Sequence, residues 1–187
     1  MNPDPDPERP DHEWAGRAKA GDRNAFTVLV QRHQHALHRY LSRMTGTPDE
    51  AMELAQEVFV RAWQALPQWQ PDAPFRAWLF RIASNAALDL LRRRRTVEFV
   101  PIDDQLEPAD PGADPERQVV AKQEVRLLEA ALKRLTPEHR QILLLREVED
   151  MAYEEIGRVL SLSAGTVKSR LARARMALIE ETRRNEG

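Results

Sequence analysis

The spacing of apolar residues along the chain predicts helices and no strand. In the first half, apolar side chains recur every three or four residues, the period of one helix face, at Phe26, Leu29, Val30, His33 and Leu37, and again at Leu54, Val58, Ala62 and Leu66. Thr47 precedes Pro48 and Glu50, an arrangement that favours a helix start with a capping box. The prolines at 67, 71 and 74 then predict a loop over 67–74.

A further helix is predicted from Phe75 to the arginine run at 92–95. Its apolar stripe consists of Phe75, Leu79, Ile82, Ala86 and Leu90. Residues 98–118 carry four prolines and seven acidic residues against one arginine, which indicates a flexible linker. Helix is expected again from about Pro115, with Thr136 as the cap of a later helix.

These segments predict an all-α protein of two small helical domains joined by a flexible, acidic, proline-rich linker. The predicted divisions are a disordered tail over 1–11, a first domain over 12–97, the linker over 98–118, and a second domain over 119–187. The tail is assigned because prolines at 3, 5, 7 and 10 alternate with acidic residues.

Composition narrows the class of protein. The chain has 187 residues, 42% of them hydrophobic, and no cysteine, so disulfides and thiolate metal sites are excluded. No apolar run is long enough to span a membrane and no signal-peptide pattern is present, which predicts a cytoplasmic protein. The net charge of −2 conceals segregation, because 76–95 holds six arginines against one aspartate while 98–118 is acidic. Separate basic patches of this kind indicate binding of a polyanion.

The C-terminal segment has the pattern of a helix-turn-helix. Residues 152–160 form the first helix, Ser161-Leu162-Ser163 the turn, and residues from Ala164 the second helix. Gly157 is expected to permit a close crossing and Ser163 to cap the second helix. The predicted buried stripe of that second helix comprises Val167, Leu171, Ala174 and Leu178.

The opposite stripe of the second helix carries small and basic side chains, as a helix that reads a DNA groove requires. The outward residues are Gly165, Lys168, Ser169, Ala172, Arg173 and Met176, with Arg170 and Arg175 flanking the buried stripe. An ordinary amphipathic helix with a solvated basic face is the alternative. The preceding helix, the three-residue turn and the absence of acidic residues on the outward face favour DNA binding.

Two surfaces of the first domain are candidate binding sites. Trp78, Arg81, Asn85 and Arg92 share a helix face suited to unstacked bases, and Trp69 in the preceding loop offers a further stacking surface. Either tryptophan could instead be a core residue, and the arginines a solvated helix end. The helix from 49 to 66 has an acidic first half followed by aromatic residues, which favours a basic protein partner over DNA.

His33, His35 and His38 raise the possibility of a metal site, but their spacing matches no common site and His33 lies on the apolar face. No metal and no cofactor is therefore predicted. A metal-dependent helical hydrolase using these histidines is one alternative reading. The other is a helix-turn-helix regulator with a helical sensor domain. That alternative does not account for the acidic helix or for the helix face that carries Trp78.

Several of these segments together resemble the extracytoplasmic-function branch of the sigma-70 family. The resemblance runs from about Ala18 to Leu178. The segments that carry it, in the family's order, are 20–26 (AGDRNAF), 50–63 (EAMELAQEVFVRAW), 74–85 (PFRAWLFRIASN), 135–144 (LTPEHRQILL) and the helix-turn-helix.

The resemblance implies a non-enzymatic sigma factor that binds core RNA polymerase and promoter DNA and takes no small-molecule substrate. It implies polymerase binding by Glu50, Glu53, Gln56, Glu57 and Phe59. It implies contacts to the −10 element by Trp69, Trp78, Arg81, Asn85 and Arg92. It implies contacts to the −35 element by Gly165, Thr166, Lys168, Ser169, Arg170, Ala172, Arg173 and Arg175.

The resemblance also implies control by an anti-sigma factor, expected to be membrane-anchored, that clamps the hydrophobic faces of both domains. Three departures from the family pattern stand out. Glu53 replaces a usual aspartate, Ala152 replaces a common serine cap, and Ala172 stands where some members carry a large side chain.

Overall fold

The computed structural model describes residues 9–97 and 115–185, and within them every regular element is a helix. The N-terminal helices are α1 (Asp11–Lys19), α2 (Arg23–Thr45), α3 (Pro48–Ala65) and α4 (Phe75–Val97), with a short 3-10 turn, η1 (Leu66–Gln68), after α3. The C-terminal helices are α5 (Pro115–Arg134), α6 (Pro137–Leu143), α7 (Tyr153–Leu160) and α8 (Ala164–Asn185). A π-helical turn, η2 (Leu144–Val148), follows α6. The predicted all-α class is thus confirmed.

Most of the predicted linker and tail lie outside the described residues, namely 98–114 and 1–8. Residues 115–118 belong to α5, so the predicted linker extends too far at its C-terminal end. In the N-terminal tail, Asp11 already belongs to α1. Asp11 contacts α2 through Arg32 at 3.0 Å and through Nε2 of His33 at 2.7 Å, and these contacts attach α1 to the domain.

Local sequence signals account for the helix ends. Asp22 accepts a hydrogen bond from the Ala25 N–H, and this bond together with Arg17 holds the pKa of Asp22 below its usual value. Gly46 ends α2 in the left-handed conformation at φ +84°, with its N–H donating to Ser42 O. Thr47 precedes α3 as predicted, but its hydroxyl donates to the Glu50 carboxylate and caps no backbone N–H.

The predicted apolar stripes form the core of the N-terminal helices. Leu29, His33 and Leu37 of α2 are buried, as are Leu54, Val58, Ala62 and Leu66 after them. On α4, Phe75, Leu79 and Ala86 are buried, whereas Ile82 and Leu90 are only partly covered. Burial of these side chains supplies the main stabilising free energy of the bundle.

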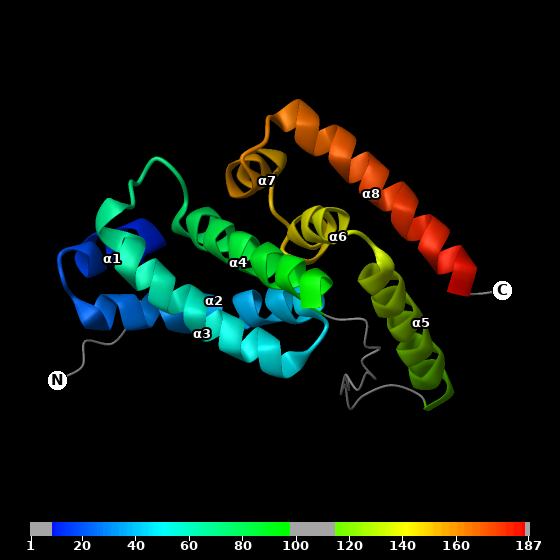
Figure 1. Ribbon diagram of the computed structural model, residues 1–187. Coiled ribbons are helices and arrows are strands. Elements are labelled where there is room, and N and C mark those ends of the chain that lie inside the picture. Colours follow the sequence, from blue (N-terminus) through cyan, green and yellow to red (C-terminus); the bar gives the residue numbers. More distant parts are fainter. Residues whose placement is uncertain (1–8, 98–114, 186–187) are drawn as a thin grey trace.

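The two groups of helices pack against each other and share one core, an arrangement that the sequence did not predict. Figure 1 shows α7 beside α4 and α6 lying across the C-terminal part of α4, while α8 runs along the outside. Arg140 of α6 is buried and donates to Met44 O at the end of α2 and to Leu132 O at the end of α5. Its burial lowers the pKa of Arg140 to about 10.

A buried chain of polar side chains also crosses between the two groups. The Gln141 amide of α6 donates to Ser84 O of α4 at 3.3 Å, and the Ser84 hydroxyl lies 2.8 Å from the Tyr40 hydroxyl of α2. Burial raises the pKa of Tyr40, so its hydroxyl stays protonated. These satisfied bonds fix the orientation of α6 on the N-terminal helices.

The turn between α7 and α8 depends on Gly157. A Cβ placed on this residue would lie 2.7 Å from the carbonyl oxygen of Leu162, which is rigid backbone. The Leu162 N–H donates back to Gly157 O at 2.8 Å. The predicted close approach at Gly157 is confirmed. The group that Gly157 approaches is the backbone of the turn between α7 and α8.

We therefore expect Gly157→Ala to lower the free energy of unfolding by about 2 kcal/mol, because the added methyl group overpacks the turn. Gly165→Ala is the matched control, since no atom lies within 4 Å of its added Cβ. Alanine in that helical position should raise stability by up to about 1 kcal/mol. Urea unfolding of both variants measures the difference, and equal stability of the two would contradict this account.

Candidate nucleic-acid interface

The helix-turn-helix formed by α7 and α8 presents one long exposed face. Val167, Leu171 and Ala174 are fully buried against the core, and Leu178 is partly buried. Ser163 accepts a hydrogen bond from the Thr166 N–H at 3.3 Å, which confirms the predicted cap of α8. At the start of α7, the Glu155 carboxylate accepts from the Ala152 N–H at 3.0 Å, so the glutamate half of a capping box is present and the half that a serine would supply is missing.

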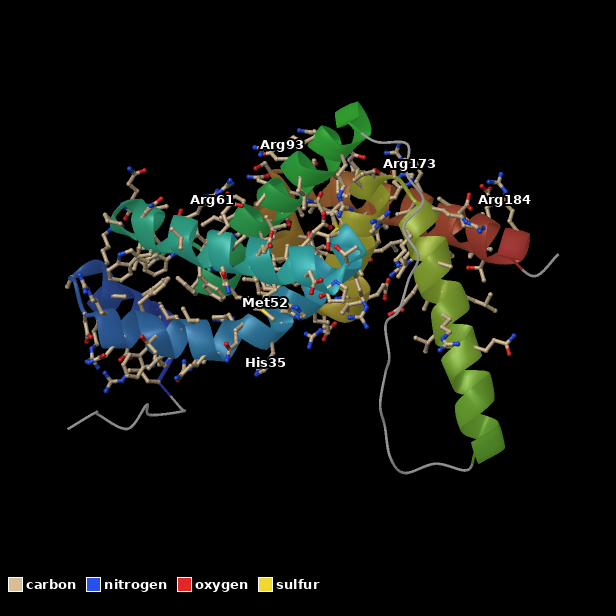
Figure 2. The ribbon with its side chains drawn as sticks, turned by 60° about the horizontal axis from the view of Figure 1, so that its bottom comes forward. His35, Met52, Arg61, Arg93, Arg173 and Arg184 are labelled. Atoms are coloured by element: carbon tan, nitrogen blue, oxygen red, sulfur yellow. The ribbon has the colours of Figure 1, made fainter. Side chains whose placement is uncertain are left out.

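The predicted outward face of α8 is accessible along its length. Seven of the eight residues assigned to DNA contact on this helix are exposed: Gly165, Lys168, Ser169, Ala172 and Arg173 on the outward side, with Arg170 and Arg175 at its edges. Figure 2 shows Arg173 extending outward from the ribbon of α8. Thr166 is partly covered, and its hydroxyl lies 2.9 Å from that of Ser163.

Arg175, another member of the set, forms an ion pair with an acidic side chain. Its guanidinium donates to Glu147 Oε1 at 2.6 Å and 3.0 Å, and the hydrogen bond to Glu147 raises the pKa of Arg175. Both side chains are about half exposed, so the pair is weak in water. A phosphate could therefore compete with Glu147 for Arg175 at little cost.

The predicted base-binding face of α4 is only partly open. Arg81, Asn85 and Arg92 are exposed, and Trp78 is half-buried with its ring 5.4 Å from that of Phe75. Trp69 differs from the prediction, because it is 4% exposed and packs edge-on to Phe75 at 6.2 Å. In this conformation Trp69 is a core residue, and its ring is not offered to a base.

A cavity of about 440 Å³ separates the α4 face from the helix-turn-helix. One wall consists of Trp69, Ala77, Trp78 and Arg81, and the opposite wall consists of Gly157, Arg158 and Ser161. The end of α7 and the turn that follows it thus lie over the N-terminal part of the predicted base-binding face. Trp78 and Arg81 line this cavity, whereas Asn85 and Arg92 are exposed and are not among its lining residues.

The acidic face of α3 is exposed as predicted. Glu53, Gln56 and Glu57 are exposed, and Phe59 is half-buried. Glu57 pairs with Arg61 one turn later, and Glu50 is bound by Arg94 of α4 as well as by Thr47. Of the acidic residues assigned to polymerase contact, Glu50 thus has intramolecular partners from two elements, while Glu53 is in no ion pair that the structure records.

An apolar groove of about 380 Å³ lies between α2 and α3, next to this acidic face. It is lined by Val30, Gln34, His35, His38, Met52, Ala55, Gln56 and Phe59. Met52 is 53% exposed, which is high for a large apolar side chain, and Figure 2 labels it together with His35. This groove was not predicted from the sequence. The signal that could have revealed it is the presence of apolar residues beside the acidic face of a helix.

The three histidines considered as metal ligands lie in different surroundings. His33 is 2.7 Å from Asp11 and lies in the core, whereas His35 is exposed. Within residues 9–97 and 115–185, no group of three or more His, Asp or Glu side chains is placed to hold a metal ion. No helix among the described residues is long and apolar enough to cross a membrane.

The fold and this site define a two-part helical DNA-binding protein with a helix-turn-helix. Comparison with known proteins agrees with this description and also identifies the family. Residues 29–97 match the family model "Sigma-70 region 2", and residues 126–178 match "Sigma-70, region 4". The chain is 37% identical over 180 residues to the RNA polymerase sigma factor CnrH of Cupriavidus metallidurans, covering 92% of this chain and 94% of that one. It is 29% identical over 177 residues to the ECF RNA polymerase sigma factor SigW of Bacillus subtilis, covering 89% and 94%.

A solved structure of CnrH in complex with the cytosolic domain of CnrY matches with a TM-score of 0.70 and 32% identity, covering 91% of this chain and 95% of that one. The chain belongs to the extracytoplasmic-function branch of the sigma-70 family. It is a sigma factor, which binds core RNA polymerase and directs transcription initiation at promoters.

Proposed function

We propose that α8 reads the −35 element in the major groove through Lys168, Ser169 and Arg173, with Thr166, Arg170 and Arg175 on phosphates. The observation that carries this proposal is the exposed face of residues 165–176 of α8, which has no acidic side chain and lies opposite the buried Val167, Leu171 and Ala174. Small residues at 165, 169 and 172 allow the helix axis to approach the groove floor. On α4, Trp78, Arg81, Asn85 and Arg92 would contact the −10 element.

Core polymerase would be bound through the acidic face of α3, centred on Glu53, Gln56 and Glu57. The exposed carboxylates suit a basic protein surface, and the adjoining groove at Met52 and Phe59 supplies apolar contact area. In this role the protein acts without catalysis of its own, in the cytoplasm where polymerase and promoter DNA meet.

An anti-sigma factor is the proposed regulator. The support is the likeness to CnrH, which was solved in complex with the cytosolic domain of CnrY. A regulator that covers the groove between α2 and α3 would exclude polymerase from the same surface. The membrane anchor predicted for it would belong to the regulator and not to this chain.

Arg173→Ala tests the −35 assignment. If Arg173 reads a base through two hydrogen bonds, its loss should weaken binding by about 1–3 kcal/mol and relax discrimination at one base pair. Arg183→Ala is a matched control, because Arg183 is an exposed arginine near the end of the same helix. Run-off transcription from single-base −35 variants measures the effect. An equal loss on all sequences would make Arg173 a phosphate contact.

Glu53→Lys tests the polymerase surface. The charge reversal should abolish binding to purified core polymerase while leaving circular dichroism and thermal unfolding unchanged, since Glu53 is exposed. Glu180→Lys reverses an exposed glutamate on α8 and should bind normally. Wild-type affinity of the Glu53 variant would refute the assignment of α3, and the absence of any promoter-specific transcript from the unmodified protein would refute the proposed function as a whole.

A further inference from the structure

The cavity between α4 and the turn after α7 has the dimensions of a small-molecule site. Its volume is about 440 Å³, and ligand sites in proteins commonly measure about 300–1,000 Å³. Two arginines, two glutamines and one aspartate are among the residues that line it. Charged and amide side chains in a cavity of this size favour a polar ligand, and their positions indicate which polar groups that ligand carries.

Trp69 brings an unused hydrogen-bond donor to this cavity. The residue is 4% exposed, and its Nε1 atom is buried without a hydrogen-bond partner among the described residues. Its ring packs edge-on to Phe75 and its backbone N–H donates to Leu66 O at 3.0 Å, so the position of the indole is fixed. A buried N–H without an acceptor is costly. Because Trp69 lines the cavity, a ligand bound there is able to supply the acceptor.

Trp78 supplies an aromatic surface to the same cavity. Its side chain is half-buried, and its ring lies 5.4 Å from that of Phe75. Tryptophan rings stack on planar aromatic groups, and such stacking accepts any nucleobase. Asp72 in the preceding loop adds an exposed carboxylate, which accepts hydrogen bonds from amino or hydroxyl groups. The wall that contains Trp69, Asp72 and Trp78 therefore suits a nucleobase and its sugar.

Two cations lie on opposite walls of the cavity, Arg81 on α4 and Arg158 on α7. Both are exposed, and within residues 9–97 and 115–185 neither takes part in a hydrogen bond or ion pair that the structure records. Guanidinium groups bind phosphate through paired hydrogen bonds. Ala73 and Ala77 also line the cavity, which places it beside the N-terminal end of α4, where the helix dipole favours an anion. These groups together indicate a phosphate.

We propose that this cavity is a binding site for a free mononucleotide, such as adenosine monophosphate. The phosphate lies between Arg81 and Arg158, and the base stacks on Trp78. An acceptor atom of the base takes the hydrogen bond from the Trp69 indole. A DNA strand carries the same chemistry, and Trp78 and Arg81 also belong to the proposed −10 face. Arg158 does not belong to that face, so its substitution distinguishes a free nucleotide from a strand.

Isothermal titration calorimetry of the full-length protein with adenosine monophosphate tests the site directly. The nucleotide should bind with a stoichiometry of one. Adenosine lacks the phosphate and ribose phosphate lacks the base, so each should bind at least about tenfold more weakly. Absence of nucleotide binding would overturn the proposal. Equal affinity for ribose phosphate would also overturn it, because the cavity would then recognise a phosphate alone.

Arg158→Gln should weaken the binding of adenosine monophosphate by about tenfold or more, because one of the two cations that hold the phosphate is lost. Arg183→Gln is the matched control, since Arg183 is an exposed arginine that does not line the cavity. It should bind the nucleotide as the unmodified protein does. Circular dichroism should be unchanged in both variants, because both side chains are exposed. Unchanged affinity of Arg158→Gln would refute the phosphate site.

Trp69→Phe and Trp14→Phe remove the same group from two buried indoles. Both Nε1 atoms lack a hydrogen-bond partner among the described residues, but only Trp69 lines the cavity. Because the lost N–H has no partner within the chain, neither variant gives up an intramolecular hydrogen bond. Trp69→Phe should weaken nucleotide binding by about fivefold or more, whereas Trp14→Phe should leave it unchanged. Equal affinity of the two variants would refute the contact assigned to Trp69.

A labelled single-stranded oligonucleotide of mixed sequence identifies the source of the nucleotide. If the cavity takes a free nucleotide, Arg158→Gln should weaken binding of adenosine monophosphate and leave binding of the oligonucleotide within about twofold. Equal losses for the two ligands would assign the cavity to a DNA strand and overturn the proposal. Failure of promoter-specific transcription would refute the proposed function and leave the calorimetric result intact.

Discussion

The mutual packing of the two helical groups depends on how a small number of buried polar groups are satisfied. Arg140 and Gln141 lie in α6 and Glu149 directly follows η2, and each one finds a partner on α2 or α4. If the groups separated, these side chains would regain water and lose little, whereas in the packed form each must be bonded. The polar groups therefore make the interface specific in its geometry, while the apolar core that the two groups share supplies its stabilising burial.

This interface explains why the sequence predicted the elements well and their arrangement poorly. Helix periodicity identified the buried stripes of α2, α3 and α8 because apolar side chains at regular spacing leave one interpretation. The residues that join the two groups are charged or amide side chains, and such residues are normally exposed. Nothing in the spacing of Arg39 or Arg76 distinguishes them from other surface arginines, so their pairing with the buried carboxylate of Glu149 follows only from a tertiary structure.

Trp69 is another residue whose surroundings could not be predicted from the sequence. An aromatic ring in a proline-rich loop can serve equally as a stacking surface or as a core side chain, and local sequence does not decide between them. The structure has Lys19 of α1 donating to the Trp69 carbonyl oxygen at 2.8 Å, with the ring against Phe75. The loop is thereby attached to α1, and no feature of the sequence predicted this contact.

The charge distribution explains how a protein with a net charge of −2 can bind DNA. The cations are placed on helix faces, while the acids of α3 form a separate face and Glu149 is neutralised internally. Two surfaces of opposite sign allow one chain to bind a basic protein and an anionic duplex at once, which a uniformly basic protein could not do. Glu147 extends this separation of charge to α8, because its exposed pair with Arg175 partly neutralises that arginine in the free protein, and under the proposed function a phosphate would replace Glu147.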